Sequence, residues 1–288
     1  MPGNLIAVAD GRDSLFATLD TDGAVSVWSG RDEVRCRFIA EFARAVVPVR
    51  SGHIAIVAGE EEATVVVGSW TRGVAAFGLD GQVRWHRQDI RHVQGLRAVP
   101  GADGRGQVLA VVRERGTGLV LGRSGGTRYQ VPGARFLDGW PDGSLLVFNG
   151  KQASRRAAPY SGSSWSIDLA AFAVLDAVVG DGALICGADG SLVHAGDDGE
   201  VRWRVTTGKG RRAVRAWADP HGAGWVCLAP TNVSGSVPRV LRITREGVIA
   251  ASADCAGTWI GFAFGGRCLV AADGTVCDVP DLAPVVSQ

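Results

Sequence analysis

The sequence predicts an all-β fold built from a repeated four-stranded unit. Residues Phe77–Trp85 read FGLDGQVRW, and residues Ala195–Trp203 read AGDDGEVRW. Each copy is a strand, an Asp-Gly turn and a second strand that ends in Trp, which is the pattern of a β-hairpin. Short apolar runs alternate with turn signals along the rest of the chain. The predicted outer turns recur about every 43 residues, the period of a β-propeller blade; they lie at Gly30, Gly81, Gly126, Gly162, Gly199 and Gly247.

The first four blades follow from runs of four strands within about 40 residues. In the first blade the expected strands are Leu5–Val8, Ser14–Leu19, Ala24–Trp28 and Val34–Phe38. The second has Ile54–Ala58, Ala63–Val67, Val74–Phe77 and Gln82–Trp85. The third has Leu96–Val99, Gln107–Val112, Gly118–Leu121 and Thr127–Val131. The fourth is expected over 135–168, with an irregular third strand around Gln152–Ala157.

The same alternation continues to the end of the chain. The fifth blade is expected at Ala173–Val179, Ala183–Cys186, Ser191–His194 and Glu200–Val205. The sixth is expected at Val214–Ala218, Gly224–Leu228, Arg239–Ile243 and Val248–Ala251. A seventh begins with Thr258–Phe262, Arg267–Val270 and Thr275–Cys277. Its last strand is either Ala283–Val286 or the N-terminal strand, which would close the ring. We therefore expect one domain over residues 1–288, with seven blades of four antiparallel strands, and six blades as the alternative.

Two stretches are ambiguous between helix and strand. Phe38–Val47 and Ile167–Val179 both allow a helical period of apolar residues. We interpret each as the end of a strand followed by a linker.

Composition restricts the function classes. Apolar residues make up 46% of the chain, yet no apolar run approaches the roughly 20 residues that span a bilayer. The start at Met1–Asn4 lacks the basic and apolar parts of a signal peptide, so we expect a cytoplasmic protein. The net charge of +1 gives no general attraction to nucleic acid or membrane. Nearly all cations are Arg, which points to a GC-rich bacterial genome. The six cysteines contain no C-x-x-C pair, and we expect reduced thiols in the core.

The hairpin copies resemble the repeat of quinoprotein-type propellers, and the blade rhythm is similar to that of WD-repeat propellers. A looser copy is Ile243–Ile249. The resemblance implies a propeller architecture and no specific family. The quinone-dependent dehydrogenases of that superfamily hold a metal beside the cofactor, and the sequence shows no matching metal site. We therefore expect neither a cofactor nor a metal.

Two short motifs resemble catalytic or phosphate-binding sequences, but the residues around them exclude both interpretations. Gly122–Gly126 matches G-x-S-x-G, but the strand that follows excludes the strand-to-helix elbow of a hydrolase. Gly208–Arg212 is glycine-rich and basic but lacks the full spacing of a phosphate-binding loop. The five histidines form no tight metal pattern. The sequence leaves open whether the protein is an enzyme and favours the view that it is not.

Propeller topology predicts an uneven distribution of charge. Linkers between blades and the turns between second and third strands open on one side, here called the first face; the other turns open on the second face. The first face would receive Arg44, Arg72, Arg91, His92, Lys151, Lys209, Arg211 and Arg212. The second would receive Asp13, Glu60, Glu61, Glu62, Asp80, Asp103, Asp142, Asp181, Asp197, Asp198, Asp219 and Glu246. This predicts a disc with one basic and one acidic face, able to attract an anionic partner.

The leading hypothesis is a protein-interaction scaffold or accessory subunit. Its partner would bind the basic face at Trp70, Arg72, Arg91, His92, Lys209, Arg211 and Arg212. An alternative is an enzyme, or a protein that binds a small molecule such as an anion, with its site at the mouth of the central channel. The channel candidates are Arg135, Asp138, Asp176, Arg215 and Asp254, with His92 beside them. A weaker alternative is nucleic-acid binding through the cations of Arg202–Arg215.

Overall fold

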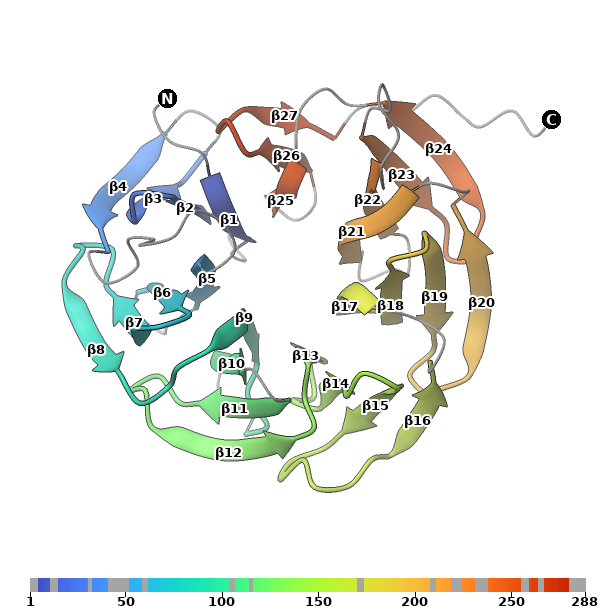
Figure 1. Cartoon of the computed structure of the whole chain (residues 1–288), viewed down its shortest axis with the longest axis horizontal. Coiled ribbons are helices and arrows are strands. Elements are labelled where there is room, and N and C mark those ends of the chain that lie inside the picture. Colours follow the sequence, from blue (N-terminus) through green and yellow to red (C-terminus); the bar gives the residue numbers. More distant parts are fainter. Residues whose placement is uncertain are drawn as a thin grey trace.

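Antiparallel sheets stand round one central axis (Figure 1). The structure, a computed structural model, describes residues 5–10, 15–30, 33–40, 52–58, 62–103, 107–113, 116–169, 174–207, 211–218, 224–230, 238–254, 259–263 and 267–279. In each sheet the strands follow one another in chain order from the axis to the rim. All of the secondary structure in these residues is strand and turn, so neither ambiguous stretch contains a described helix.

The described residues form twenty-seven strands. The first sheet is β1 (Leu5–Asp10), β2 (Phe16–Asp20), β3 (Ala24–Trp28) and β4 (Val34–Ile39). The second is β5 (Gly52–Val57), β6 (Thr64–Ser69), β7 (Gly73–Phe77) and β8 (Val83–Arg87). The third is β9 (Val93–Pro100), β10 (Gln107–Arg113), β11 (Thr117–Leu121) and β12 (Thr127–Pro132). The fourth is β13 (Phe136–Gly139), β14 (Leu145–Phe148), β15 (Gln152–Arg156) and β16 (Trp165–Asp168).

The remaining sheets follow the same order. The fifth is β17 (Val174–Gly180), β18 (Gly182–Gly187), β19 (Ser191–Ala195) and β20 (Val201–Thr206). The sixth is β21 (Arg211–Ala218), β22 (Gly224–Pro230), β23 (Arg239–Ile243) and β24 (Ile249–Asp254). The seventh is β25 (Trp259–Ala263), β26 (Cys268–Ala271) and β27 (Val276–Asp278).

The predicted blade pattern needs a correction. Six sheets have four strands, but the sheet β25-β26-β27 has three within the described residues. The prediction of seven four-stranded blades is therefore wrong, and so is the alternative of six blades. The N-terminal strand does not supply a fourth strand here, because β1 pairs with β2 in its own sheet. Its Leu5 N–H donates to the Ala272 carbonyl at 2.6 Å, which joins the first sheet to the seventh. The other predicted closing strand, Ala283–Val286, lies outside the described residues.

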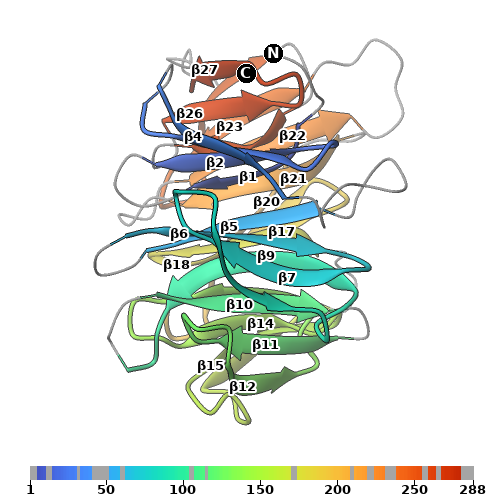
Figure 2. The ribbon, with the colours of Figure 1, turned by 90° about the vertical axis from the view of Figure 1, so that its left-hand side faces the viewer.

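Burial differs between inner and outer strands. Every residue of β2 and of β19 is buried, because each sheet is covered on both faces by its neighbours. The outermost strand β20 instead alternates between exposed and half-buried residues, as expected at the rim. Figure 2 shows the ring from its side, with neighbouring sheets stacked against each other.

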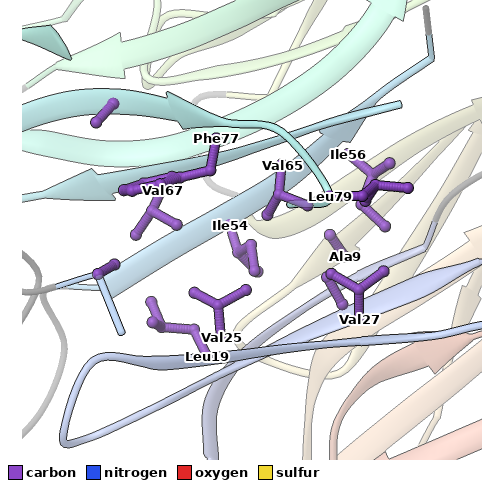
Figure 3. Close-up of a cluster of buried hydrophobic side chains, with 13 residues drawn as sticks. Ala9, Leu19, Val25, Val27, Ile54, Ile56, Val65, Val67, Phe77 and Leu79 are labelled. Atoms are coloured by element: carbon purple, nitrogen blue, oxygen red, sulfur yellow. The ribbon is translucent and has the colours of Figure 1, made fainter. Parts of the chain in front are cut away.

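The core is divided among the gaps between sheets. Figure 3 shows the cluster between the first two sheets, where Leu19 and Val25 lie toward Ile54 and Val67. A comparable cluster fills each following gap. Each sheet therefore contributes to two clusters and depends on both neighbours for its burial. Three cysteines are described as free thiols, and Cys186 and Cys268 are buried among these side chains.

Within the described residues, a Trp on the outermost strand of the second, fourth and fifth sheets joins that sheet to the next one at the rim. The indole Nε1 of Trp85 donates to the Arg123 carbonyl of the third sheet's outer turn at 2.6 Å. Trp203 donates in the same way to the Arg245 carbonyl of the sixth sheet at 2.8 Å. From their place at the ends of the two hairpin copies, the sequence predicts that Trp85 and Trp203 pack between blades, and these contacts confirm it. Trp165 makes the third such bond, to the Asp197 carbonyl at 2.9 Å. We call these three contacts the rim joints.

The turn glycine is the other half of each rim joint. Gly247 has φ of +80°, and a Cβ added there would lie 2.5 Å from Trp203 Cγ. The corresponding distance from Gly199 to Trp165 Cγ is also 2.5 Å. Only glycine combines a left-handed backbone with an indole in contact at this distance. This explains why an outer turn that faces a Trp carries glycine at this position.

One boundary between blades uses a different pair. Tyr160 lies where the other outer turns have glycine: its N–H donates to the Ala157 carbonyl at 2.7 Å, and its φ is +66°. The side chain is fully buried, and its hydroxyl donates to the Gly143 carbonyl at 3.1 Å. Tyr129 of the third sheet meets this ring edge-on at 5.2 Å. The ring of Tyr129 is smaller than an indole and meets Tyr160 at a right angle, which leaves room for the Tyr160 side chain in the turn.

Candidate functional site

Four of the predicted first-face residues come together where the second and third sheets meet. Trp70 and Arg72 lie in the turn between β6 and β7, and Arg91 and His92 lie in the linker between β8 and β9. The His92 N–H donates to the Trp70 carbonyl at 2.7 Å. The two rings meet edge-on with centroids 5.1 Å apart. The linker and the turn are therefore held as one unit.

Cations surround this unit. Arg72 and Arg91 are exposed. The Arg113 Nε donates to the Arg91 carbonyl at 3.2 Å, which fixes a third guanidinium beside them. We call Trp70, Arg72, Arg91, His92 and Arg113 the first-face patch.

Asp89 is an acid next to this patch, and it is already paired. Arg87 donates to both of its oxygens at 2.7 Å. The pKa of Asp89 is lowered to about 2, mainly by the hydrogen bonds from Arg87 and to a smaller extent by the charge of Arg113. Asp89 therefore balances Arg87 and leaves the patch with a positive charge.

The other predicted first-face cations lie elsewhere. Arg211 and Arg212 begin β21 in the sixth sheet, where their backbones pair with Pro230 and Ala229. Lys209 lies outside the described residues. The structure thus separates the predicted set into the first-face patch and a segment of the sixth sheet.

The predicted division into a basic and an acidic face is not what the structure shows. On the second face Asp103 pairs with Arg128 at 3.0 Å, and Asp142 pairs with Arg155 at 2.8 Å. Further pairs join Asp80 and Glu62 to Arg84, Asp181 to Arg245, and Asp198 to Arg202. The first face also carries acids in its turns, namely Asp22, Asp189 and Asp273. The acids of these turns lie beside arginines of the outer strands, which a count of turn residues alone leaves out.

A second group of polar residues lines the axis. Asp138, Asp176 and Arg215, three of the predicted channel candidates, lie on the innermost strands β13, β17 and β21. Two residues that the sequence argument missed join them: His53 on β5 and Arg97 on β9. We call these five residues the channel cluster.

Strand pairing places the channel cluster at two levels along the axis. His53, Asp176 and Arg215 occupy equivalent positions in their sheets. Their partners on the second strands are Gly68, Cys186 and Cys227, which pair in turn with Val74, Leu192 and Val240. Each of these last three lies four residues before the start of an outer turn. By the same register Arg97 and Asp138 are equivalent to each other, one level further along the strands.

Asp176 connects three sheets. It is 2% exposed. Its Oδ1 accepts a hydrogen bond from Arg97 Nη2 at 2.9 Å, and its Oδ2 accepts one from the Ala216 N–H at 2.9 Å. The ion pair therefore runs from the third sheet to the fifth, and the backbone bond continues to the sixth. A buried carboxylate with both oxygens engaged satisfies the condition for a stable buried charge.

Asp138 and His53, like Asp176, each form a hydrogen bond with the backbone of the next blade. Asp138 Oδ2 accepts the N–H of Val179 on β17 at 2.9 Å, and a hydrogen bond links His53 to the backbone of Val93 on β9. Innermost strands have an unpaired edge, so these side chains satisfy backbone groups that no ladder reaches. We call the contacts made by His53, Asp138 and Asp176 the axis joints.

The pKa values in the cluster reflect burial and the neighbouring charges. Burial raises the pKa of the Asp138 carboxyl, while the charge of Arg97 opposes this rise. Burial, together with the positive charges of Arg215 and Arg97, lowers the pKa of His53 to about 4. His53 is therefore neutral at pH 7.

Two predicted channel residues do not belong to the cluster. Asp254 ends the outermost strand β24, where it accepts a hydrogen bond from Arg239 Nε at 2.6 Å. Arg135 precedes β13 as an exposed residue, and its N–H donates to the Phe148 carbonyl at 2.6 Å. His92, considered beside them, belongs to the first-face patch. A charged residue within an innermost strand was the signal that could have identified Arg97.

The basic segment Arg202–Arg215 does not form one surface. Arg202 lies on the rim strand β20 and pairs with Asp198 and Glu200. Arg215 lies on the innermost strand β21. The cations proposed for nucleic-acid binding thus lie at opposite edges of neighbouring sheets.

A metal-binding cluster and a membrane-spanning helix are both absent from the described part of the chain. No three His, Cys, Asp or Glu side chains there are grouped so that they could hold a metal ion. The described residues also contain no helix of the length and apolarity needed to cross a bilayer.

Comparison with known proteins identifies the fold. No family model matches the sequence, and no curated protein matches it significantly. Among solved structures, the β-propeller domain of Cps50 (Swd1) from Myceliophteria thermophila is similar with a TM-score of 0.71 and 11% identity, over 97% of this chain and 94% of that one. The WD40 β-propeller domain of Doa1 is similar with a TM-score of 0.67 and 15% identity, over 95% of this chain and 91% of that one. At these identities the likeness is one of fold, so the predicted β-propeller is confirmed without a specific family.

Proposed function

We propose that this propeller is a protein-interaction module whose first-face patch binds an acidic segment of a partner protein. The observation that carries the proposal is the fixed arrangement of Trp70 and His92 with three guanidinium groups around them. We further propose a bacterial cytoplasmic setting, which the Arg-rich, Lys-poor composition supports.

The patch suits a carboxylate-bearing peptide for chemical reasons. A guanidinium offers donors in a planar fork that matches a carboxylate, and such charge-assisted bonds are stronger than neutral ones. Trp70 is half-buried, so it offers an apolar surface beside the cations. Because the His92 bond already fixes the turn and the linker, little conformational entropy is lost when a partner binds.

The test uses charge reversal with a matched control. The variant Arg72→Glu/Arg91→Glu removes two cations from the patch and adds two acids. The control Arg35→Glu/Arg37→Glu makes the same change in charge at exposed positions of the rim strand β4. Proteins retained from a lysate of the source cell are identified by mass spectrometry, and the most abundant is purified and titrated against each form.

The expected result is a stoichiometric partner that binds the wild type and the control alike and binds the patch variant at least about tenfold more weakly. Raised salt should also weaken the wild-type complex. A second variant, Arg211→Glu/Arg212→Glu, tests whether these residues and Lys209 extend the surface. Equal binding by the patch variant, or no stoichiometric partner, would show that the proposal is wrong.

A further inference from the structure

The three rim joints differ in the residue that lies beside the indole on the neighbouring strand of the same sheet. Strand pairing places Arg155 beside Trp165, His194 beside Trp203, and Ala76 beside Trp85. Arg155, His194 and Ala76 each lie two residues before the start of an outer turn, so the three positions are equivalent. Side chains that pair across antiparallel strands share one face of the sheet. These residues therefore decide what fills the space beside each indole.

In the fifth sheet an imidazole fills this space. The His194 ring stacks on Trp203 with centroids 5.3 Å apart and an angle of 17° between the planes. Its Nε2 lies 2.7 Å from the Asp181 carbonyl, and a carbonyl only accepts, so Nε2 carries the proton and donates. The residue is buried. A rim joint thus accommodates a planar heteroaromatic ring stacked on its indole.

In the fourth sheet a guanidinium fills the equivalent space. Arg155 Nη1 donates to the Asp197 carbonyl at 3.1 Å, and the same carbonyl accepts the indole N–H of Trp165. The guanidinium carbon also lies 4.6 Å from the ring centre of Trp140. In both of these sheets a planar group of the chain itself occupies the joint.

In the second sheet the space is left open. Ala76 is fully buried and has no atom beyond Cβ. A cavity of about 300 Å³, which includes its opening to solvent, lies between the second and third sheets and is lined by Trp85 and Val66. Both residues pair with Ala76, so the cavity lies over the face of the sheet that carries Ala76.

The other walls of the cavity are mainly apolar. Leu109 of the third sheet is 2% exposed and occupies the position of Gly224 in the sixth sheet, yet the cavity remains beside it. Thr64 adds a hydroxyl, which can donate to or accept from a ring nitrogen. The described lining includes Arg123 and no acid, so a cation would find no compensating charge there. These walls suit a neutral ring with a polar edge.

We propose that this cavity binds a small, neutral heteroaromatic molecule of the imidazole class, with its ring stacked on Trp85. The arrangement is that of His194 on Trp203, with a free molecule in place of the side chain. The bond from Trp85 Nε1 to the Arg123 carbonyl fixes the indole, so the stacking surface is preformed. The cavity lies beside the outer turn of the third sheet, on the second face. It is separate from the first-face patch and does not depend on the function proposed for it.

The experiment titrates imidazole into the ¹⁵N-labelled full chain at pH 8, where imidazole is neutral. The indole N–H signal of Trp85, identified by its loss in Trp85→Phe, is followed by NMR. It should shift and saturate with a Kd on the order of 1 mM, as expected for so small a ligand. Tetrahydrofuran, a saturated ring of the same size, should bind at least about tenfold more weakly, because it cannot stack as an aromatic ring does.

Two variants and a control test the position of the ligand. Ala76→His supplies an imidazole from the chain itself and should weaken binding about tenfold or more. The control Gln130→His adds the same side chain at an exposed position of the rim strand β12 and should bind as the wild type does.

The second variant, His194→Ala, opens the equivalent space in the fifth sheet. Imidazole should then also shift the indole N–H signal of Trp203, as binding at a second site. This variant leaves the cavity beside Trp85 intact, so it tests the stacked arrangement even if Ala76→His does not fold.

Four outcomes would overturn the proposal. One is the absence of a saturable shift at Trp85 in the wild type. Another is wild-type binding by a folded Ala76→His protein, which would place the ligand elsewhere. The third is binding of tetrahydrofuran as tight as that of imidazole, which would show a cavity for any apolar molecule. The fourth is the absence of a new site in His194→Ala.

Discussion

Neighbouring blades are connected by apolar contacts at the rim and by polar contacts at the axis. At the rim, Trp203 lies on the glycine of the next blade's turn and donates one hydrogen bond to it. At the axis, Asp176 accepts a hydrogen bond from the Ala216 N–H of the next blade and forms an ion pair with Arg97 of the third sheet. The three rim joints are alike, whereas each axis joint differs from the others.

This difference shows where the fold leaves room for function. A rim joint requires a large aromatic ring on one blade and a glycine in the turn of the next, so the two residues cannot vary independently. An axis joint requires only an acceptor or a donor for an unpaired strand edge, and many polar side chains can supply that. Residues at the axis are therefore free to differ between blades and to acquire a binding role.

The largest expected effect is at the rim. Trp203→Ala removes the aromatic surface between the fifth and sixth sheets together with its hydrogen bond. We expect a loss of about 3 kcal/mol in the free energy of unfolding, measured by urea denaturation. Val201→Ala on the same strand, where Val201 is 43% exposed, should cost less than about 0.5 kcal/mol. Equal losses in the two variants would mean that the joint does not hold the blades together.

Substitution of the turn glycine in the same joint should lower the free energy of unfolding by a smaller amount. Gly247→Ala adds a Cβ 2.5 Å from Trp203 Cγ at a left-handed backbone position. We expect about 2 kcal/mol of destabilisation in the same urea experiment. Gly162→Ala is the control, because nothing lies within 4 Å of a Cβ there. A Gly247→Ala protein as stable as the control would contradict the account of the Asp-Gly-Trp repeat.

The smallest effect concerns the axis and depends on pH. The pKa of His53 is about 4 in the folded protein and 6.5 as its ordinary value. The unfolded chain thus binds more protons between these values, and folding stability falls as pH falls through this window. Between pH 7 and pH 5 this group should cost about 1.5 kcal/mol.

The variant His53→Gln should remove that part of the pH dependence. Urea denaturation at pH 7 and pH 5 gives the loss of stability for each protein. The loss should be smaller in His53→Gln than in the wild type by the amount above. The same loss in both proteins would show that His53 is not held neutral at the axis.

The features that the sequence predicted well are local ones. The Asp-Gly turns at Gly81 and Gly199 follow from turn chemistry within the nine residues of each hairpin copy. The three-stranded seventh sheet was not predicted, because three strands and four strands share the same local alternation. Tyr160 was also missed, since a left-handed tyrosine leaves no turn signal in the sequence.

The site was harder to predict because its contacts are distant in the chain. Arg97 and Asp176 are 79 residues apart, and only the closed ring brings them together. Asp138, Asp176 and Arg215 could be selected because innermost strands line the axis of any propeller. His53 escaped notice since it lies just before the predicted strand Ile54–Ala58.

The paired shapes at the rim also determine the order of the blades. A turn with Gly247 accepts an indole, whereas the turn with Tyr160 accepts only the edge of Tyr129. A circular permutation would preserve every such pair, because it changes only where the chain begins. Exchange of the fourth and sixth blades would instead place Trp203 against Tyr160 and leave Tyr129 over a bare glycine. The ring therefore tolerates a different chain start but not a different order of blades.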